Sequence, residues 1–277
     1  MKSRHVLPLA ILAVVIGGGL VAVFTLIDWI PLQASEQAER VDPLMWFVVI
    51  ASGVIFTIVM TFLLYSIFRF KAPEGDEEDG PPIHGNTKLE IAWTLVPTVL
   101  LAVMAVWAYL VLTENEALAE DRMIVNVTAE QFAWTFTYPD LGVESGDLRL
   151  PVDRQVELRM TAVDVIHDLY VPEFRVKQDV VPGVITQLII DPIRVGKYPV
   201  ICAELCGLGH NTMRANVFVM PQDEFSRWQQ EAKRQVAAGS AAEGGQPAAD
   251  GEQPAGDAAG TRPEGAEQPT GDDAASQ

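Results

Sequence analysis

The chain has 277 residues, 49% of them hydrophobic and 20% charged, and its formal net charge at pH 7 is −18. Lys and Arg number 19 against 37 Asp and Glu, so a nucleic-acid partner, which needs a basic surface, is not expected, and a basic protein partner is favoured. Two cysteines exclude a disulfide-dense secreted scaffold. An apolar content this high beside so many acids indicates that the apolar residues are concentrated in a few segments.

Three runs, residues 6–27, 44–68 and 91–112, contain no charged residue, and each is long enough to span a bilayer, which takes roughly 20 apolar residues. The second and third lack the polar stripe that a helix of a soluble domain shows at a period of about 3.6 residues. We therefore predict an N-terminal hydrophobic segment at residues 1–28 and a transmembrane helical hairpin at residues 43–112. The N-terminal segment is a membrane helix or a signal peptide, and its length, with no A-x-A site after it, favours the helix.

Basic residues flank these segments unequally. Five lie on one side of the predicted membrane, whereas the other side has only Arg40 and, in the first stretch after residue 112, Arg122. Because Lys and Arg are enriched on the cytoplasmic side, we predict a multi-pass protein of the plasma membrane whose remaining chain lies on the outer, periplasmic side. The five basic residues are Lys2, Arg4, Arg69, Lys71 and Lys88.

Residues 113–234 consist of short β-branched or alternating segments separated by turn residues. In one of them, Val156, Leu158, Met160 and Ala162 alternate with polar neighbours, as in a strand with one buried face. Turn residues space the segments at intervals typical of a sandwich or barrel, so we predict an all-β domain. The other segments are residues 123–128, 131–138, 184–191, 198–203 and 213–220.

Residues 235–277 consist almost entirely of Ala, Gly, Glu, Gln, Pro and Asp. Eight acidic residues stand there against Arg262 alone. Such a composition has almost no aliphatic side chain that could bury surface and offset the entropy cost of folding. The sequence therefore predicts a disordered acidic tail.

The residues that indicate chemistry are Cys202, Cys206, His210 and Met213, which lie within twelve residues of one another, together with His167. Thiolates, imidazoles and a thioether are soft to borderline ligands, which suit copper better than magnesium or calcium. A mononuclear blue-copper site takes one thiolate, so the second cysteine favours two copper ions bridged by two sulfurs, each ion with one histidine. A Cys2His2 zinc site and a disulfide between the two cysteines are the alternatives.

The run from residue 202 to residue 213 reads C-x-E-x-C-x-x-x-H-x-x-M, and it resembles the metal motif of subunit II of haem-copper cytochrome c oxidases. The resemblance covers residues 44–220 and implies a membrane-anchored cupredoxin-like Greek-key β-barrel that holds the binuclear CuA centre. It implies these ligands: Cys202 and Cys206 as bridges, His167 and His210 as terminal ligands, Met213 as a weak ligand, and Glu204 through its backbone carbonyl. The Glu204 carboxylate, by the same resemblance, reaches a magnesium ion shared with subunit I.

The resemblance also implies a role in electron entry. In that family, cytochrome c docks on an acidic face, and its electron enters at CuA and continues to the haem of subunit I, where oxygen is reduced. The implied partners are subunit I, the other oxidase subunits, a cytochrome c or similar donor, and membrane lipid. Asp164 and Asp179 are close in sequence to His167, and they are candidate docking charges because opposite fields speed encounter.

Two further positions follow from the resemblance. Family members often have Gln-Trp-aromatic-Trp where residues 131–134 read Gln-Phe-Ala-Trp, so Phe132 aligns with the usual electron-entry tryptophan. Trp134, two residues on, is expected on the same face of a strand.

The segment that begins at Thr87 resembles the start of the family's second helix, where a glutamate, here Glu90, lies at the mouth of a proton channel. Thr87 and Glu90 also fit a T-x-x-E capping box.

Two other functions share part of this pattern. The CuA subunit of a nitric oxide reductase would show the same donor-side residues, and Glu90 favours the oxidase over it. A membrane-anchored copper carrier is the second alternative, but it needs exchangeable ligands on an exposed loop. A quinol oxidase subunit is disfavoured, because the resembling quinol-using subunits lack the thiolates.

Overall fold

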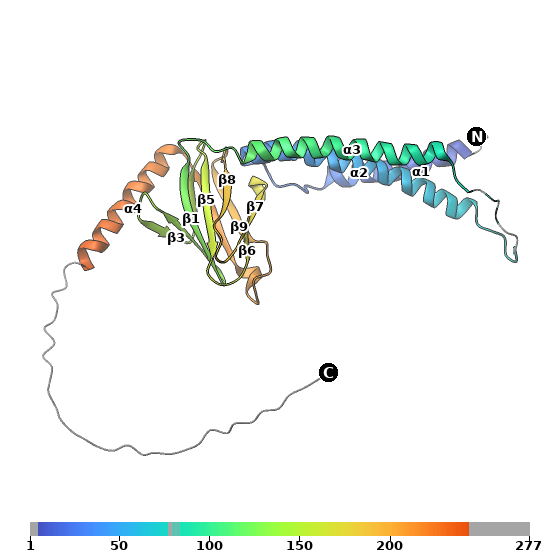
Figure 1. Ribbon diagram of the computed structural model, residues 1–277. Helices are drawn as coiled ribbons and strands as arrows, with labels where there is room; N and C mark the ends of the chain where they lie inside the picture. The colour runs from blue at the N-terminus through green and yellow to red at the C-terminus, as the bar shows by residue number, and fades with distance from the viewer. Residues whose placement is uncertain (1–4, 77–79, 81, 83, 244–277) are drawn as a thin grey trace, which may run out of the picture. The chain divides into compact units, whose positions relative to one another are not determined.

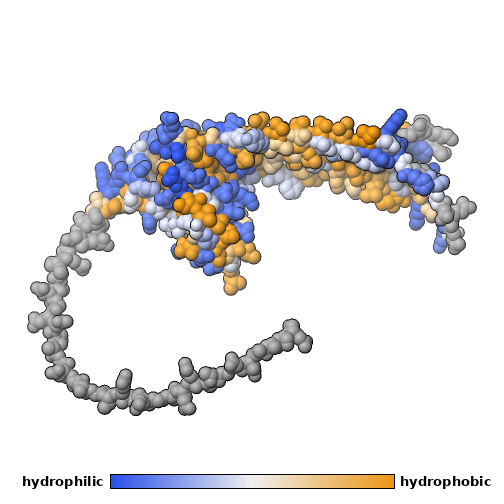
Figure 2. All heavy atoms as spheres, viewed as in Figure 1, coloured by the Kyte–Doolittle hydropathy of each residue, from blue (hydrophilic) through white to orange (hydrophobic). Residues whose placement is uncertain are grey.

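The computed structural model describes residues 5–243 except 77–79, 81 and 83, with side chains described up to residue 238. Three helices, α1, α2 and α3, are long and apolar enough to cross a membrane, and hydrophobic side chains cover them (Figure 2). α1 packs along α2, and α2 packs along α3 (Figure 1). Each of the three overlaps one of the uncharged runs, so the helical structure of these runs is confirmed, and their crossing of a membrane stays a prediction. They span Val6–Leu26, Glu36–Arg69 and Thr87–Asn115.

The start of α3 differs from the predicted capping box. The capping residue is Asn86, whose side-chain oxygen accepts hydrogen bonds from the N–H groups of Lys88 at 3.2 Å and Leu89 at 3.3 Å. Glu90 reaches back, and its Oε1 accepts from the Asn86 N–H at 3.1 Å. Asn caps a helix at least as well as Thr, so the helix begins one residue earlier than a cap at Thr87 would allow.

The strands after α3 form two sheets that pack around one core (Figure 1). Their strand orders are β3-β2-β1-β5-β8 and β4-β10-β9-β6-β7. β1 with β5 and β10 with β4 pair in parallel, and the other neighbours pair antiparallel. The predicted cupredoxin-like β domain is confirmed, and it takes the form of a sandwich of two five-stranded sheets. The strands are Met123–Glu130, Ala133–Tyr138, Val143–Ser145, Leu148–Pro151, Val156–Ala162, His167–Val171, Val176–Val180, Thr186–Ile190, Gly196–Cys202 and Arg214–Met220.

A further helix, α4, follows the last strand and spans Gln222–Glu243. Phe225 is fully buried, and the Trp228 ring packs against Tyr138 with their centroids 4.9 Å apart. The prediction of disorder from residue 235 is wrong at its start, because α4 continues to residue 243. Residues 236–243 are rich in Ala, the strongest helix former, and they extend a helix already fixed by packing. Residues 244–277 lie outside the described residues.

A buried ion pair joins the first turns of α2 to the β-sandwich. Arg175 Nε donates to Asp42 Oδ1 at 2.8 Å and Arg175 Nη2 donates to Asp42 Oδ2 at 3.1 Å, and both side chains are only 8% exposed. Gln33 Nε2 also donates to Asp42 Oδ2, at 2.7 Å. The guanidinium donates further to the carbonyl oxygens of Pro172 at 2.6 Å and Pro31 at 2.5 Å. Such a pair is tolerated away from water because hydrogen bonds satisfy both partners.

Replacing Asp42 by Asn is expected to loosen this junction, since removing one partner of a buried ion pair costs about 3–5 kcal/mol. The N–H groups of Ala34 and Ile193 donate across the junction, each at 3.0 Å. Their amide hydrogen exchange, measured on the full chain in detergent, should become faster. Asp223→Asn is the control, because its ion pair lies in solvent and such pairs contribute about 0–1 kcal/mol. Unchanged exchange in the Asp42 variant would contradict this account of the junction.

Candidate metal centre

Two neighbouring strands of one sheet supply the first candidate ligands. His167 is the first residue of β6 and Cys202 the last residue of β9, and the two strands pair antiparallel with Leu169 opposite Cys202. The N–H of Ala203 donates to the carbonyl oxygen of Asp168 at 3.0 Å, which fixes the end of β9 beside the start of β6. The pairing therefore brings together a histidine and a cysteine that are far apart in the sequence.

The other candidate ligands lie on the loop that returns from β9 to β10. Cys206 lies within this loop, the short 3₁₀ helix η3 begins at His210, and Met213 directly precedes β10. Gly207 has φ +137, a backbone conformation that L side chains rarely adopt, so the turn after Cys206 requires glycine. Because this one loop is tight, its donors, which are close in the sequence, also lie close together in space.

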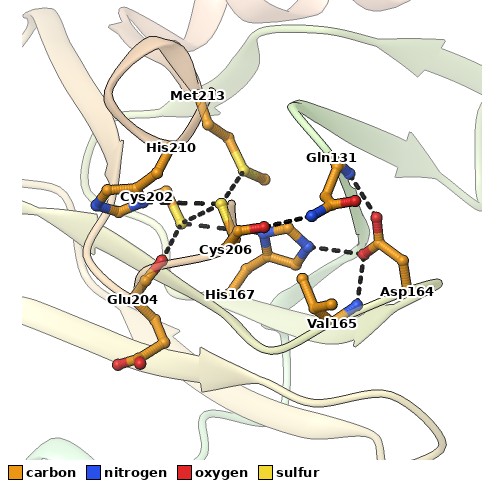
Figure 3. A network of polar contacts seen from close by, with 9 residues as sticks. All are labelled: Gln131, Asp164, Val165, His167, Cys202, Glu204, Cys206, His210 and Met213. Carbon is orange, nitrogen blue, oxygen red and sulfur yellow. Dashed lines mark hydrogen bonds and ion pairs between the residues drawn. The ribbon is translucent and has the colours of Figure 1, made fainter. Parts of the chain in front are cut away.

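The two thiol sulfurs form the middle of the site, 3.8 Å apart, and each faces a different histidine (Figure 3). Cys202 Sγ lies 3.9 Å from His167 Nδ1, and Cys206 Sγ lies 3.7 Å from His210 Nδ1. The ligand atoms of His167 and the two cysteines all lie within 4.8 Å of one another, and His210 falls outside this group. The histidines therefore approach the sulfur pair from different sides. A single tetrahedral zinc ion would instead place four donors about 2.0–2.3 Å from one point.

Two weaker donors complete the surroundings of the sulfurs. Met213 Sδ lies 3.7 Å from Cys206 Sγ, and the backbone carbonyl oxygen of Glu204 lies 3.3 Å from Cys202 Sγ. The Glu204 side chain is exposed, and its carboxylate points away from the sulfurs (Figure 3). All six residues named as copper ligands from the sequence are thus gathered around one pair of thiols.

Most of the candidate ligand side chains are shielded from water, and His210 is half-buried. The two cysteines are each 3% exposed, His167 and Met213 are fully buried, and neither cysteine forms a disulfide. Burial, together with the neighbouring Cys202 thiol, raises the pKa of Cys206 to about 11. A thiolate at this position therefore needs a cation beside it. Two sulfurs, two imidazoles and a thioether fit copper, a soft to borderline metal, and their arrangement around the sulfur pair fits two ions.

Asp164, predicted as a docking charge, is exposed and also lies behind the candidate ligand His167. Its Oδ1 accepts from His167 Nε2 at 2.9 Å and from the Val165 N–H at 2.7 Å, and its Oδ2 accepts from the Gln131 N–H at 2.7 Å. The hydrogen bond from His167 holds the pKa of Asp164 down at about 2. The Gln131 side chain also donates to the carbonyl oxygen of Cys206. Sequence reasoning missed these positioning contacts, because no spacing rule links residue 131 or 164 to the cysteine loop.

The two aromatic residues proposed for electron entry lie in different places. Phe132 precedes β2 in a turn, so the rule that residues two apart share a strand face does not apply, and that expectation is wrong. Its ring is 37% exposed and lies against the cysteine loop, where a Cβ added at Gly209 would be 2.5 Å from Phe132 Cδ2. Trp134 is 3% exposed and packs edge-on to the His167 ring, with their centroids 6.1 Å apart. Of these two aromatic residues, only Phe132 reaches solvent.

The remaining predicted site residues are spread more widely. Asp179 is exposed on β7, directly opposite Asp168 of β6. Asp168, which sequence reasoning did not single out, is 4% exposed, and burial is the main cause that raises its pKa to about 6. Glu90 lies in the first turn of α3, an exposed position in a groove that also includes Thr94 and Thr98. At 1.5 Å per residue, the length of α3, about 40 Å, separates Glu90 from the start of the sandwich.

Comparison with known proteins gives consistent matches over most of the chain. A family model described as the transmembrane domain of cytochrome c oxidase subunit II matches residues 25–111, and one described as the periplasmic domain of that subunit matches residues 104–219.

The cytochrome c oxidase subunit 2 of Synechocystis sp. is 34% identical over 246 residues, which cover 72% of this chain and 74% of the relative. The alternative cytochrome c oxidase subunit 2 of Bradyrhizobium diazoefficiens is 32% identical over 259 residues, covering 81% and 91%. Among solved structures, the periplasmic domain of subunit II of cytochrome oxidase of Bradyrhizobium japonicum is 26% identical, with a TM-score of 0.41, and covers 43% of this chain and 99% of that one.

Replacing Gly209 by Ala should weaken copper binding, because the new methyl group meets the Phe132 ring at 2.5 Å and must push the loop away. Overpacking of this kind costs about 1–3 kcal/mol. Copper retained per chain after dialysis against a chelator is the measurement. Gly146→Ala is the control, since a Cβ there meets nothing within 4 Å. The double variant Gly209→Ala with Phe132→Ala should regain copper, and failure to do so would show that the ring contact is not the cause.

Replacing Asp164 by Ala should lower the affinity for copper about 10- to 100-fold, the usual effect of removing an acceptor that orients a ligand histidine. A competition titration of the full chain against a copper chelator measures the change. Asp140, an exposed aspartate in a turn, provides the control variant Asp140→Ala. Equal copper affinity in the Asp164 and Asp140 variants would mean that the His167 contact does not position the ligand.

Proposed function

Because the chain belongs to the cytochrome c oxidase subunit II family, we propose that its outer domain is the electron-entry module of the oxidase and holds a binuclear copper centre. The chain is a subunit of a terminal oxidase complex in a membrane-anchored family, so other oxidase subunits are its neighbours. The observation that carries the proposal is the buried thiol pair with one histidine on each side. The proposed donor is cytochrome c or a similar protein, and the acceptor is the haem of subunit I.

The proposed ligand set follows from the distances around the sulfur pair. Cys202 and Cys206 would hold the copper ions between them, His167 and His210 would bind from either side, and a thioether and a carbonyl would complete the set. A copper pair held there would supply a redox centre that accepts and releases one electron. The last two ligands are Met213 and the backbone oxygen of Glu204.

Residues of the chain outside the ligand set hold the proposed ligands in position. The Asp164 carboxylate accepts from His167 Nε2, so the proton stays on Nε2 and the lone pair of Nδ1 faces the sulfurs. The buried packing excludes water and keeps the ligands in one geometry. A site that changes shape little between two oxidation states suits fast electron transfer, and rigid strands on both sides of the site favour that behaviour.

The residues around the centre have proposed roles of their own. Phe132 is the proposed entry point for the electron, because its ring is part-exposed and lies on the cysteine loop. Asp179 is exposed and remains a candidate docking charge, whereas the hydrogen bonds of Asp164 favour a positioning role. The outward-pointing carboxylate of Glu204 is the proposed ligand for a magnesium ion shared with subunit I (Figure 3). Glu90 is the proposed proton entry, on the cytoplasmic side, with the sandwich on the periplasmic side.

A copper carrier fits these observations less well than an electron-entry site. A carrier releases its metal, so its ligands need access to a partner's ligands. Here both cysteines are 3% exposed, and ligands from two strands and one loop enclose them. A permanent site is therefore favoured over an exchangeable one.

Copper analysis and electron paramagnetic resonance of the full chain, purified in detergent and loaded with copper, test this proposal. The expected result is two copper ions per chain and one unpaired electron coupled to both copper nuclei. Cys206→Ser should lose this signal because one bridge is gone, while Asn211→Ser, an exposed non-ligand change in the same loop, should keep it. One copper ion with a single-nucleus spectrum, or tightly held zinc, would contradict the proposal.

A further inference from the structure

Two grooves run between α1 and α2, and they differ in charge. One, of about 500 Å³, is lined by residues such as Leu20 and Ile50, and none of its lining residues is charged. The other, of about 680 Å³, lies where α1 begins and α2 ends, and its lining includes the basic side chain of Arg69. We call the second one the Arg69 groove. The same pair of helices thus offers one wholly uncharged groove and one with a cation at its end.

The polar groups of the Arg69 groove are gathered at one end. His5 caps the start of α1, Arg69 is the last residue of α2, and His5 Nδ1 lies 2.5 Å from the hydroxyl oxygen of Tyr65. The rest of the lining is apolar and includes Leu12 and Val15. At 1.5 Å per residue these two lie roughly 10 to 15 Å along α1 from His5. The groove is therefore an apolar trough with a polar, basic end at one edge of the predicted membrane.

The charge of Arg69 is not neutralised within the described part of the chain. No Asp or Glu there lies within 4.0 Å of its guanidinium, which lies over the Phe70 ring, 5.9 Å from the ring centroid. Glu74 and Asp76 follow in the connecting loop, but neither lines the groove. An unpaired guanidinium beside a hydroxyl and an imidazole is suited to a phosphate group.

We propose that the Arg69 groove binds an anionic phospholipid, with its phosphate at Arg69 and Tyr65 and one acyl chain along Leu12 and Val15. Basic pockets between membrane helices on the cytoplasmic side are sites where anionic headgroups bind. The opposite edge of the same helix pair suits such a headgroup less well. Asp28 and Glu39 lie there, and the basic side chains of Arg40 and Arg175 are already paired with Glu36 and Asp42. The proposal concerns the membrane segment and does not depend on the copper centre.

Photo-crosslinking in the intact oxidase tests the proposal. The probe is phosphatidylglycerol with a photoreactive group on one acyl chain, added to the complex in phosphatidylcholine nanodiscs, and mass spectrometry locates the labelled peptides. We expect label on the α1 segment around Leu12. Arg69→Gln should reduce it about fivefold, the change expected for losing one basic contact with an anionic lipid. Lys71→Gln is the matched control, because Lys71 is exposed and basic at the same helix end but does not line the groove.

Three further results decide the outcome. A phosphatidylcholine probe should label the α1 segment less than the phosphatidylglycerol probe does, and Leu12→Trp, which fills the trough and keeps every charge, should abolish the label. Equal labelling by the two lipids, or an equal loss in the Arg69 and Lys71 variants, would overturn the proposal. So would a cross-link from this segment to another oxidase subunit without lipid, because a protein helix would then cover the groove. Normal haem content in each variant would show that the complex had assembled.

Discussion

The pairing of β6 with β9 is the constraint on which the candidate metal centre depends. It places Leu169 opposite Cys202, and it therefore puts His167, at the start of one strand, beside the cysteine at the end of the other. A shift of one residue in this register would turn His167 toward the opposite face of the sheet. The hydrogen bond from Ala203 to Asp168 fixes the last step of this register. The loop that follows needs only to fold back on itself to bring the other donors to the same place.

Because the same arrangement buries two thiols, a thiolate there requires a positive charge beside it. Both thiols are buried, and burial is the main cause that raises the pKa of Cys206, so a thiolate at that position needs a cation beside it. Metal ions supply the positive charge that stabilises thiolates, and the two histidines face the sulfurs with Nδ1. The protein keeps this geometry in place with contacts outside the ligand set: Asp164 behind His167, the Gln131 side chain on the Cys206 carbonyl, and Phe132 over the glycines of the loop. These contacts explain how a loop can hold a rigid centre.

Much of this structure could be predicted from the sequence, and the parts that could not have a common physical cause. The three long apolar helices follow from uncharged runs, and the clustering of Cys202, Cys206, His210 and Met213 follows from their spacing within one loop. Strands β3, β4 and β7 were not predicted because they are short or partly polar and are stabilised by their neighbours. The role of Asp164 depends on which residues a fold brings together, and local pattern carries no such information.

Two predictions from local sequence patterns were wrong because a neighbouring residue or a turn competed with the predicted local structure. The helix cap at Asn86 competes with the predicted one at Thr87, and the turn before β2 separates Phe132 from Trp134, although they are two residues apart. The buried pair between Asp42 and Arg175 joins residues 133 apart in the sequence, and no period or motif indicates it. Such long-range polar contacts are specific to a structure, and they are where a sequence-based account is least complete.

Electron entry itself is the most direct test of the account. In the purified oxidase, stopped-flow mixing with reduced cytochrome c measures how fast the haem of subunit I becomes reduced. The account predicts that Cys206→Ser abolishes this donor-driven reduction, while a small reductant that reaches the haem directly still reduces it in the same preparation. Donor-driven haem reduction at the rate of the unmodified oxidase, in a variant shown to lack the copper pair, would contradict the account.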